Sequence, residues 1–159
     1  MRRNGVMVKS VLVLVGIIGL TACATMEPKQ TLYERIKLVD QTGVPQYGRS
    51  AISLVVDDFV ANVVDDNRIN ARFKALQPPE VSRLKANLAD QICEAAGGPC
   101  AYVGRDMKET HKGMKITDAE WNATVEALSK ALDKHKVPAD QKQELIGLLA
   151  SMKADIVGQ

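Results

Sequence analysis

The sequence predicts an all-α fold in which packed helices surround one histidine-bearing segment. Apolar residues recur every three or four positions over four long stretches, which is the period of an amphipathic helix. Aromatic residues make up 4% of the chain, and a composition dominated by aliphatic residues and alanine suits helices better than a sheet sandwich. No sustained alternation of apolar and polar residues predicts a strand. The 159 residues fit one domain preceded by a targeting segment.

Residues 1–22 have the pattern of a bacterial signal peptide. Arg2, Arg3 and Lys9 give a positive start, and residues 11–20 form an apolar run that is short for a membrane span. The run ends in the sequence LTAC, which resembles the lipobox in which a cysteine is lipidated and becomes the new amino terminus. Cys23 is therefore the expected lipidation site. An ordinary signal peptide with an incidental cysteine, or an uncleaved anchor, are the alternatives.

Lipid on Cys23 would hold the protein on a membrane without a spanning helix. Ala24 follows the cysteine where Asp would direct retention at the inner membrane. By resemblance to the bacterial sorting rule, this favours the outer membrane of a Gram-negative cell, facing the periplasm. We expect residues 23–30 to be the lipidated cysteine and its tether, and residues 31–157 to be the folded domain.

The formal net charge of +2 depends on the segment expected to be removed. Without Arg2, Arg3 and Lys9, 18 of the 21 basic side chains remain against 19 acidic ones, a net charge of −1. No strongly basic domain is left, so nucleic acid is excluded as an expected partner.

Cys93 and Cys100 lie on either side of the turn-forming sequence GGP. An exported protein folds in an oxidising compartment, which permits a disulfide. The sequence leaves open whether the two form a bridge or remain half-buried thiols. Neither has the Cys or His neighbours that a zinc site requires.

Capping boxes and breakers divide the domain into helices. Thr31 with Glu34, and Thr117 with Glu120, have the Ser/Thr-x-x-Glu pattern that begins a helix. Ser50 is the expected cap of the second helix. A short helical turn is expected over residues 68–73, closed by the proline pair that follows it. The four long helices are expected at about residues 50–65, 80–96, 118–136 and 139–157.

His111 is one of only two histidines, and it lies in a segment that Gly104 opens and Gly113 closes. The capped helix beginning after Thr117 follows directly, so a flexible segment carrying an imidazole is joined to a rigid element. We interpret this as a way to present one imidazole to a buried ligand, most simply a haem iron. His135 lies near a helix C-terminus and is expected to be solvated.

Several short sequences, taken in order, resemble the group 1 truncated haemoglobins. The resemblance covers about residues 32–156 and implies a two-over-two helical sandwich that encloses haem. The motifs that carry it are LYERI (32–36), VDDF (56–59), Phe73, SRLK (82–85), GGP (97–99), YVGRDMK (102–108), HKG (111–113) and IT (116–117).

The resemblance assigns His111 to the position of the proximal iron ligand. A proximal imidazole usually donates its second N–H to a backbone carbonyl, and we expect that acceptor about one turn before His111. The haem-contacting positions implied by the resemblance are Val60, Phe73, Leu84, Leu88, Tyr102, Met107, Ile116 and Trp121. Lys85, Lys112 and Lys115 are candidates to pair with the haem propionates, or they are ordinary surface lysines.

The side of the pocket facing the open iron position departs from the family. A tyrosine is common where this chain has Val60, and a glutamine where it has Leu88; Leu84 faces the same side. A hydrogen-bond donor beside bound dioxygen stabilises the bound gas by about 1.5–3 kcal/mol. Its absence predicts dioxygen release faster by roughly tenfold or more. Carbon monoxide and nitric oxide should be less affected.

We therefore expect a membrane-tethered haem protein that reversibly binds dioxygen, nitric oxide or carbon monoxide, with a reductase as a possible partner. A haem-dependent redox enzyme, acting as a nitric oxide dioxygenase or like a peroxidase, is one alternative. It ranks lower because the distal side lacks acid–base residues. A haem-free structural lipoprotein is the other alternative.

Overall fold

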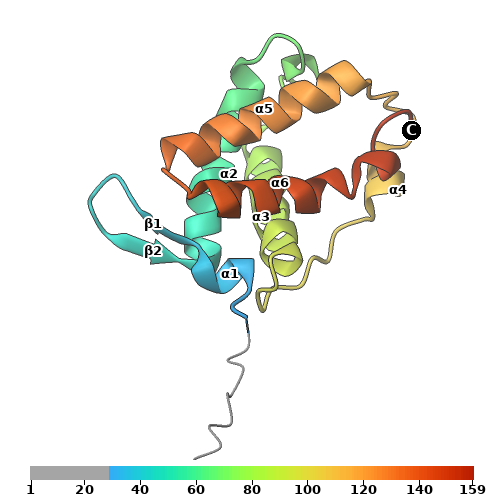
Figure 1. Ribbon diagram of the computed structural model, residues 1–159. Helices are drawn as coiled ribbons and strands as arrows, with labels where there is room; N and C mark the ends of the chain where they lie inside the picture. The colour runs from blue at the N-terminus through green and yellow to red at the C-terminus, as the bar shows by residue number, and fades with distance from the viewer. Residues whose placement is uncertain (1–28) are drawn as a thin grey trace, which may run out of the picture.

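Two pairs of helices cross each other and form the body of the molecule (Figure 1). The computed structural model describes residues 29–159, so the expected signal peptide and Cys23 lie outside the described residues. Helices α5 (Asp118–Lys134) and α6 (Ala139–Ala150) lie across α2 (Gly48–Asp65) and α3 (Pro78–Ala95). This is the two-over-two helical sandwich that the sequence predicted.

The core lies where α2 meets α3 and α5. Its apolar residues come at helical spacing from each of these elements, which explains why these stretches fold as packed helices. The largest fully buried side chains are Ile52, Val56, Cys93, Leu128 and Leu132. Asn62 adds a polar link between two helices, because its amide donates to the carbonyl oxygen of Ala127 at 2.9 Å.

Both predicted capping boxes are present. Thr31 caps the short helix α1 (Leu32–Arg35), and Thr117 caps α5; each side chain accepts from the backbone N–H of a glutamate three residues on. In contrast, the expected cap at Ser50 is wrong. Helix α2 begins two residues earlier at Gly48, where the Tyr33 ring approaches so closely that a side chain would collide with it.

Helix α3 also begins earlier than predicted. Pro78 and Pro79 form its first turn, where proline's missing N–H costs nothing, instead of closing the preceding turn. The Glu80 carboxylate caps this end by accepting from the backbone N–H of Gln77 at 2.8 Å. The predicted helical turn before it is a short 3-10 helix, η1 (Asn70–Arg72).

A small antiparallel hairpin stands where the sequence predicted no strand. It pairs β1 (Lys37–Val39) with β2 (Pro45–Tyr47) and lies between α1 and α2. The Asp40 carboxylate fixes the turn, because it accepts hydrogen bonds from the backbone N–H groups of Thr42 and Val44. Three-residue strands are too short to produce a sustained alternating pattern, which is why the sequence did not reveal them.

Helix α6 is shorter than predicted because the tail pairs with another part of the chain. After Ala150 the backbone forms a turn and a 3-10 helix, η2 (Lys153–Asp155). Gly158 then donates its N–H to the carbonyl oxygen of Ile116 at 2.9 Å, and Val157 forms a parallel bridge with Ile116. The tail is thereby fixed beside the loop that follows the histidine segment.

Cys93 and Cys100 form a disulfide, with their Cα atoms 5.8 Å apart. The bridge links the last turn of α3 to the loop leading toward α4 (Met107–His111). The alternative of two free thiols is therefore wrong. None of the helices within residues 29–159 is long and apolar enough to cross a membrane.

Candidate functional site

His111 is the last residue of the five-residue helix α4. Asp106 caps this helix by accepting from the N–H of Glu109 at 2.7 Å, and Gly113 turns the chain away with a φ of 79°. The Nδ1 atom of His111 lies 2.7 Å from the carbonyl oxygen of Met107. Because a carbonyl oxygen can only accept, Nδ1 carries the proton and Nε2 keeps a free lone pair. Met107 is thus the acceptor expected one turn before the histidine.

His111 forms part of the wall of a large apolar cavity of about 210 Å³. Of the 21 residues that line it, 16 are apolar, so the cavity favours a mostly apolar occupant. The polar members are Arg72, Gln91, His111, Glu120 and Thr124. The walls come from α2, the η1 region, α3, α4, the loop before α5, α5, α6 and the tail after α6.

Eight of the nine residues named from the sequence line this cavity. They are Val60, Phe73, Leu84, Leu88, Met107, His111, Ile116 and Trp121. The seven residues other than the histidine are apolar, and the eight come from six separate segments of the chain.

Tyr102 does not line the cavity. Its ring lies over Gly104, and its hydroxyl donates to the carbonyl oxygen of Arg105 at 2.8 Å. The side chain therefore braces its own loop ahead of α4. The lining of the cavity thus gives no support to the expected haem contact of Tyr102.

Gln91 is a cavity residue that the sequence reasoning missed. Its amide Nε2 lies 3.2 Å from the sulfur of Met107 and 3.5 Å from that of Met152. It therefore links α3 to the histidine helix and to the tail. The signal was present, because Gln91 follows Leu88 by three residues and so shares the apolar face of α3.

Arg72 and Glu120 form an ion pair on the cavity wall, and both were missed as well. The Arg72 Nε and Nη2 atoms lie 3.0 and 2.9 Å from one carboxylate oxygen of Glu120. Hydrogen bonds from the backbone N–H of Thr117 and then from Arg72 hold the pKa of Glu120 below its usual value. A fixed carboxylate thus positions one guanidinium at the cavity.

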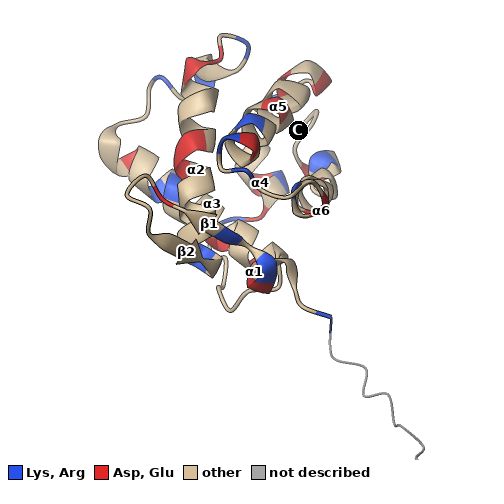
Figure 2. Cartoon of the chain, turned by 60° about the vertical axis from the view of Figure 1, so that its left-hand side comes forward, with Lys and Arg blue, Asp and Glu red and all other residues tan. Residues whose placement is uncertain are grey.

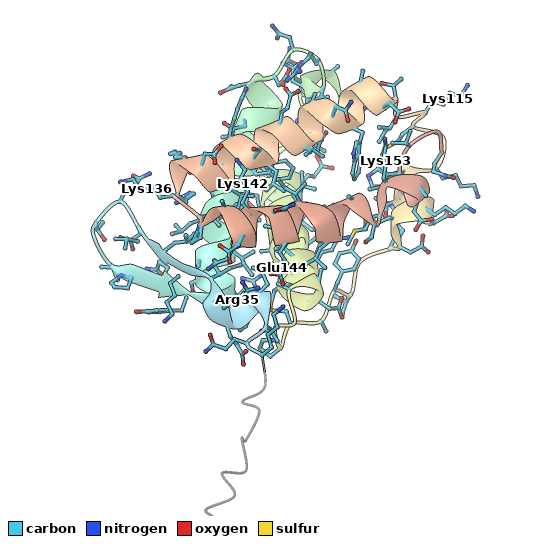
Figure 3. All side chains as sticks on the ribbon, in the orientation of Figure 1. Arg35, Lys115, Lys136, Lys142, Glu144 and Lys153 are labelled. Atoms are coloured by element: carbon cyan, nitrogen blue, oxygen red, sulfur yellow. A yellow bond between two sulfur atoms is a disulfide. The ribbon has the colours of Figure 1, made fainter. Side chains whose placement is uncertain are left out.

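The three lysines considered for the propionates do not line the cavity. Lys85 pairs with Asp57 at 2.9 Å, and Lys112 lies 3.7 Å from Glu109. Lys115 is exposed on the side of the molecule that carries α4 and the carboxyl terminus (Figure 3). Among the cavity residues within 29–159, Arg72 is the one cationic side chain.

Thr124 is the polar residue that α5 contributes to the cavity. Its hydroxyl donates to the carbonyl oxygen of Glu120 at 2.9 Å, one turn earlier in the same helix. The hydroxyl proton of Thr124 is therefore already used in this bond. The amide N–H groups of Gln91 are likewise used by the sulfurs of Met107 and Met152. Neither side chain has an uncommitted donor directed at Val60, Leu84 or Leu88.

Comparison with known proteins gives consistent results over this domain. The model of a family described as bacterial-like globin matches residues 31–157. A group 1 truncated haemoglobin of Mycolicibacterium paratuberculosis is 29% identical over 109 residues, covering 69% of this chain and 78% of that protein. A group 1 truncated haemoglobin of Synechocystis is 27% identical over 135 residues, covering 81% and 98%.

Solved structures agree with this match. The Fe(III) truncated haemoglobin of Tetrahymena pyriformis superposes with a TM-score of 0.69 at 25% identity, covering 82% of this chain and all of that one. The cyanomet 2/2 haemoglobin of Synechococcus, which has a covalently attached haem, gives a TM-score of 0.66 at 25% identity, covering 80% and 98%.

Proposed function

Because this chain belongs to the bacterial-like globin family, we propose that it holds haem in the cavity and reversibly binds a diatomic gas at the iron. The observation that carries the proposal is the orientation of His111 at the apolar cavity. The hydrogen bond to Met107 fixes the orientation of the imidazole ring and leaves Nε2 free as a metal ligand. Bound haem supplies an iron atom with a coordination position open to gas.

The residues present fit a porphyrin. A flat macrocycle with an apolar body needs a dry slot, one nitrogen donor and a cation for its carboxylates. The apolar walls supply the slot, His111 supplies the nitrogen, and Arg72 supplies the cation. The residues that would contact the ring are Val60, Phe73, Leu84, Leu88, Met107, Ile116 and Trp121.

The cavity wall formed by α2 and α3 makes fast dioxygen release the expected behaviour. Val60, Leu84 and Leu88 carry no hydrogen-bond donor, and the donors of Gln91 and Thr124 are engaged elsewhere. Dioxygen gains most from a nearby donor, whereas carbon monoxide gains little. The geometry therefore favours carbon monoxide or nitric oxide over tightly held dioxygen.

We further propose that lipid on Cys23 tethers the domain to a bacterial outer membrane, facing the periplasm. The lipobox-like sequence supports the lipid, and Ala24 supports the outer membrane. The disulfide between Cys93 and Cys100 supports export, because such bridges persist in oxidising compartments.

Absorption spectroscopy tests the gas-binding proposal, and mass spectrometry of the membrane fraction tests the lipid tether. The full chain expressed in a Gram-negative host with added haem should give an absorption band of ligated haem that shifts when the reduced protein meets carbon monoxide. Acyl groups on Cys23 should be found by mass spectrometry in the membrane fraction. A protein that never takes up haem contradicts the gas-binding proposal, and an unacylated Cys23 contradicts the tether. Peroxide turnover without gas binding would instead indicate a redox enzyme.

A further inference from the structure

Exposed apolar side chains gather on the hairpin β1–β2. The large apolar residues that are most exposed within residues 29–159 number six, and three of them lie in this hairpin. Val39 is 60% exposed, Val44 51% and Tyr47 59%. Single exposed apolar residues are common, but three within nine residues of one small element indicate a contact surface.

The strand register places Val39 and Tyr47 on one face, and Val44 lies in the turn that joins the two strands. Leu38 pairs with Gln46, and Leu38 is buried on the side that faces the body of the molecule. The neighbouring pairs, Lys37 with Tyr47 and Val39 with Pro45, therefore point outward, because side chains alternate along a strand. A hairpin packed on a core on one side is expected to carry polar residues on the other. This hairpin carries valine, proline and tyrosine there.

The outward face has a fixed shape. The Asp40 carboxylate accepts from the Thr42 hydroxyl at 2.7 Å, from two backbone N–H groups and from the Gln46 amide at 2.8 Å. These bonds, led by the one from Thr42, hold the pKa of Asp40 at about 2. Lys37 and Asp40 are the only charged residues in positions 37–47, so the hairpin appears almost entirely uncharged in Figure 2.

We propose that this outward face of the hairpin rests on the lipid surface to which the protein is tethered, an inference that depends on the proposed membrane attachment. Six residues lead from Cys23 to Lys29, which reach at most about 20 Å when fully extended. The hairpin begins just after α1, at the end of the domain where the chain enters (Figure 1). The hairpin therefore lies within reach of any bilayer that holds Cys23.

The chemistry of the face suits the region between headgroups and acyl chains. Tyrosine places an apolar ring and a polar hydroxyl there, valine and proline add apolar area, and Lys37 complements anionic headgroups. Because the tether already confines the domain near the bilayer, a small contact is enough to orient it. The contact would present the haem cavity in a fixed direction relative to the membrane.

The test attaches residues 29–159 to vesicles through an amino-terminal polyhistidine tag and a nickel-chelating lipid. We expect this stretch to fold without the leader, because 82% of this chain covers the whole length of a truncated haemoglobin from Tetrahymena. The vesicles contain phosphatidylethanolamine and phosphatidylglycerol, with or without nitroxide-bearing headgroups. A fluorophore is placed on Val44→Cys and, as a matched control, on Val103→Cys, where the native side chain is 89% exposed. The disulfide leaves no other free thiol in this stretch.

The label at position 44 should lose most of its emission to the nitroxide lipids, and the label at position 103 should keep it. Val39→Ser with Tyr47→Ser should restore the emission at position 44. Equal quenching at the two positions overturns the proposal. Quenching at position 44 that is unchanged by the two serine substitutions also overturns it. If the label at position 44 becomes less quenched by the nitroxide lipids as the protein-to-lipid ratio rises, the hairpin instead pairs two copies of the chain. Haem uptake is measured on the same samples, and acylation of Cys23 is measured in the full chain. Each of these results is independent of the quenching result, so failure of the proposed function can be told apart from failure of the hairpin proposal.

Discussion

His111 has its orientation set within its own helix, and a carbonyl acceptor about one turn earlier could therefore be predicted from the sequence. The nitrogen that faces Met107 is held by a carbonyl four residues earlier, a contact that any single helical turn can form. The side-chain positions of Tyr102 and Gln91 could not be predicted from the sequence. The Tyr102 ring turns back over Gly104 in its own loop, whereas the Gln91 amide reaches Met152 beside the cavity, and the helical period predicts neither position.

Adding a donor to the α3 wall should slow dioxygen release. In Leu88→Gln the new amide lies on the cavity face and can stabilise the bound gas by about 1.5–3 kcal/mol, slowing dissociation by roughly tenfold or more. Stopped-flow measurement of dioxygen dissociation checks this. Val81→Gln, on the same helix but outside the cavity lining, is the control and should leave the rate unchanged. A wild-type rate that is already slow, or that Leu88→Gln does not alter, contradicts the account.

The Asp58 carboxylate should give the domain a pH-dependent stability. Burial raises its pKa, but hydrogen bonds from Lys134 at 2.6 Å and His135 at 2.8 Å outweigh burial and lower it overall. A lowered folded-state pKa stabilises the fold above the ordinary value of 3.8 and loses that effect as pH falls through the folded-state value. Asp58→Asn should therefore cost on the order of 1–2 kcal/mol at neutral pH.

Urea unfolding of wild type and Asp58→Asn at several pH values measures this effect. The difference between the two proteins should shrink below pH 3.8. Asp57→Asn is the neighbouring control, since that carboxylate is mostly exposed and pairs only with Lys85. A difference that stays constant from neutral to acid pH would rule out the ion-pair origin.

Among the elements, those with local start signals were predicted well. The capping boxes at Thr31 and Thr117 placed the first residues of α1 and α5 correctly. The predicted start of α2 was wrong because the hairpin ends at Tyr47 and the helix begins directly after it, at Gly48. The predicted end of α6 was wrong because the tail leaves the helix and pairs with Ile116. The first error comes from an element next to α2 that the sequence did not predict, and the second from a contact between distant parts of the chain.

The disulfide should be the main covalent support of the loop between α3 and α4. Closing so short a loop stabilises the fold by about 2–3 kcal/mol in the chain-entropy estimate. Replacing both Cys93 and Cys100 by alanine should lower the free energy of unfolding by that amount, and the midpoint of urea unfolding should fall with it. Reductant should lower the wild-type midpoint similarly and leave the double variant unchanged. A wild-type midpoint that is insensitive to reductant would show that the bridge contributes nothing.

At the scale of the whole molecule, the cavity is the feature that every helical layer helps to build. Its walls run from Phe59 in α2 to Ile156 in the tail, and the loop bearing Ile116 is fastened to that tail. The helical periodicity predicted the apolar stripes, and the family resemblance predicted which of them face a haem. Arg72 and Glu120 escaped prediction because an ion pair between η1 and α5 appears only once the fold brings these elements together.

Haem titration of the wild-type protein, His111→Ala and His135→Ala tests the central claim most directly. His135 is the only other histidine, and it binds Asp58 away from the cavity lining. Wild type and His135→Ala should take up one haem per chain with the spectrum of a histidine-ligated iron. His111→Ala should lose that spectrum and regain it when free imidazole is added. An unchanged spectrum in His111→Ala would show that this imidazole is not the iron ligand, and the functional account would fail.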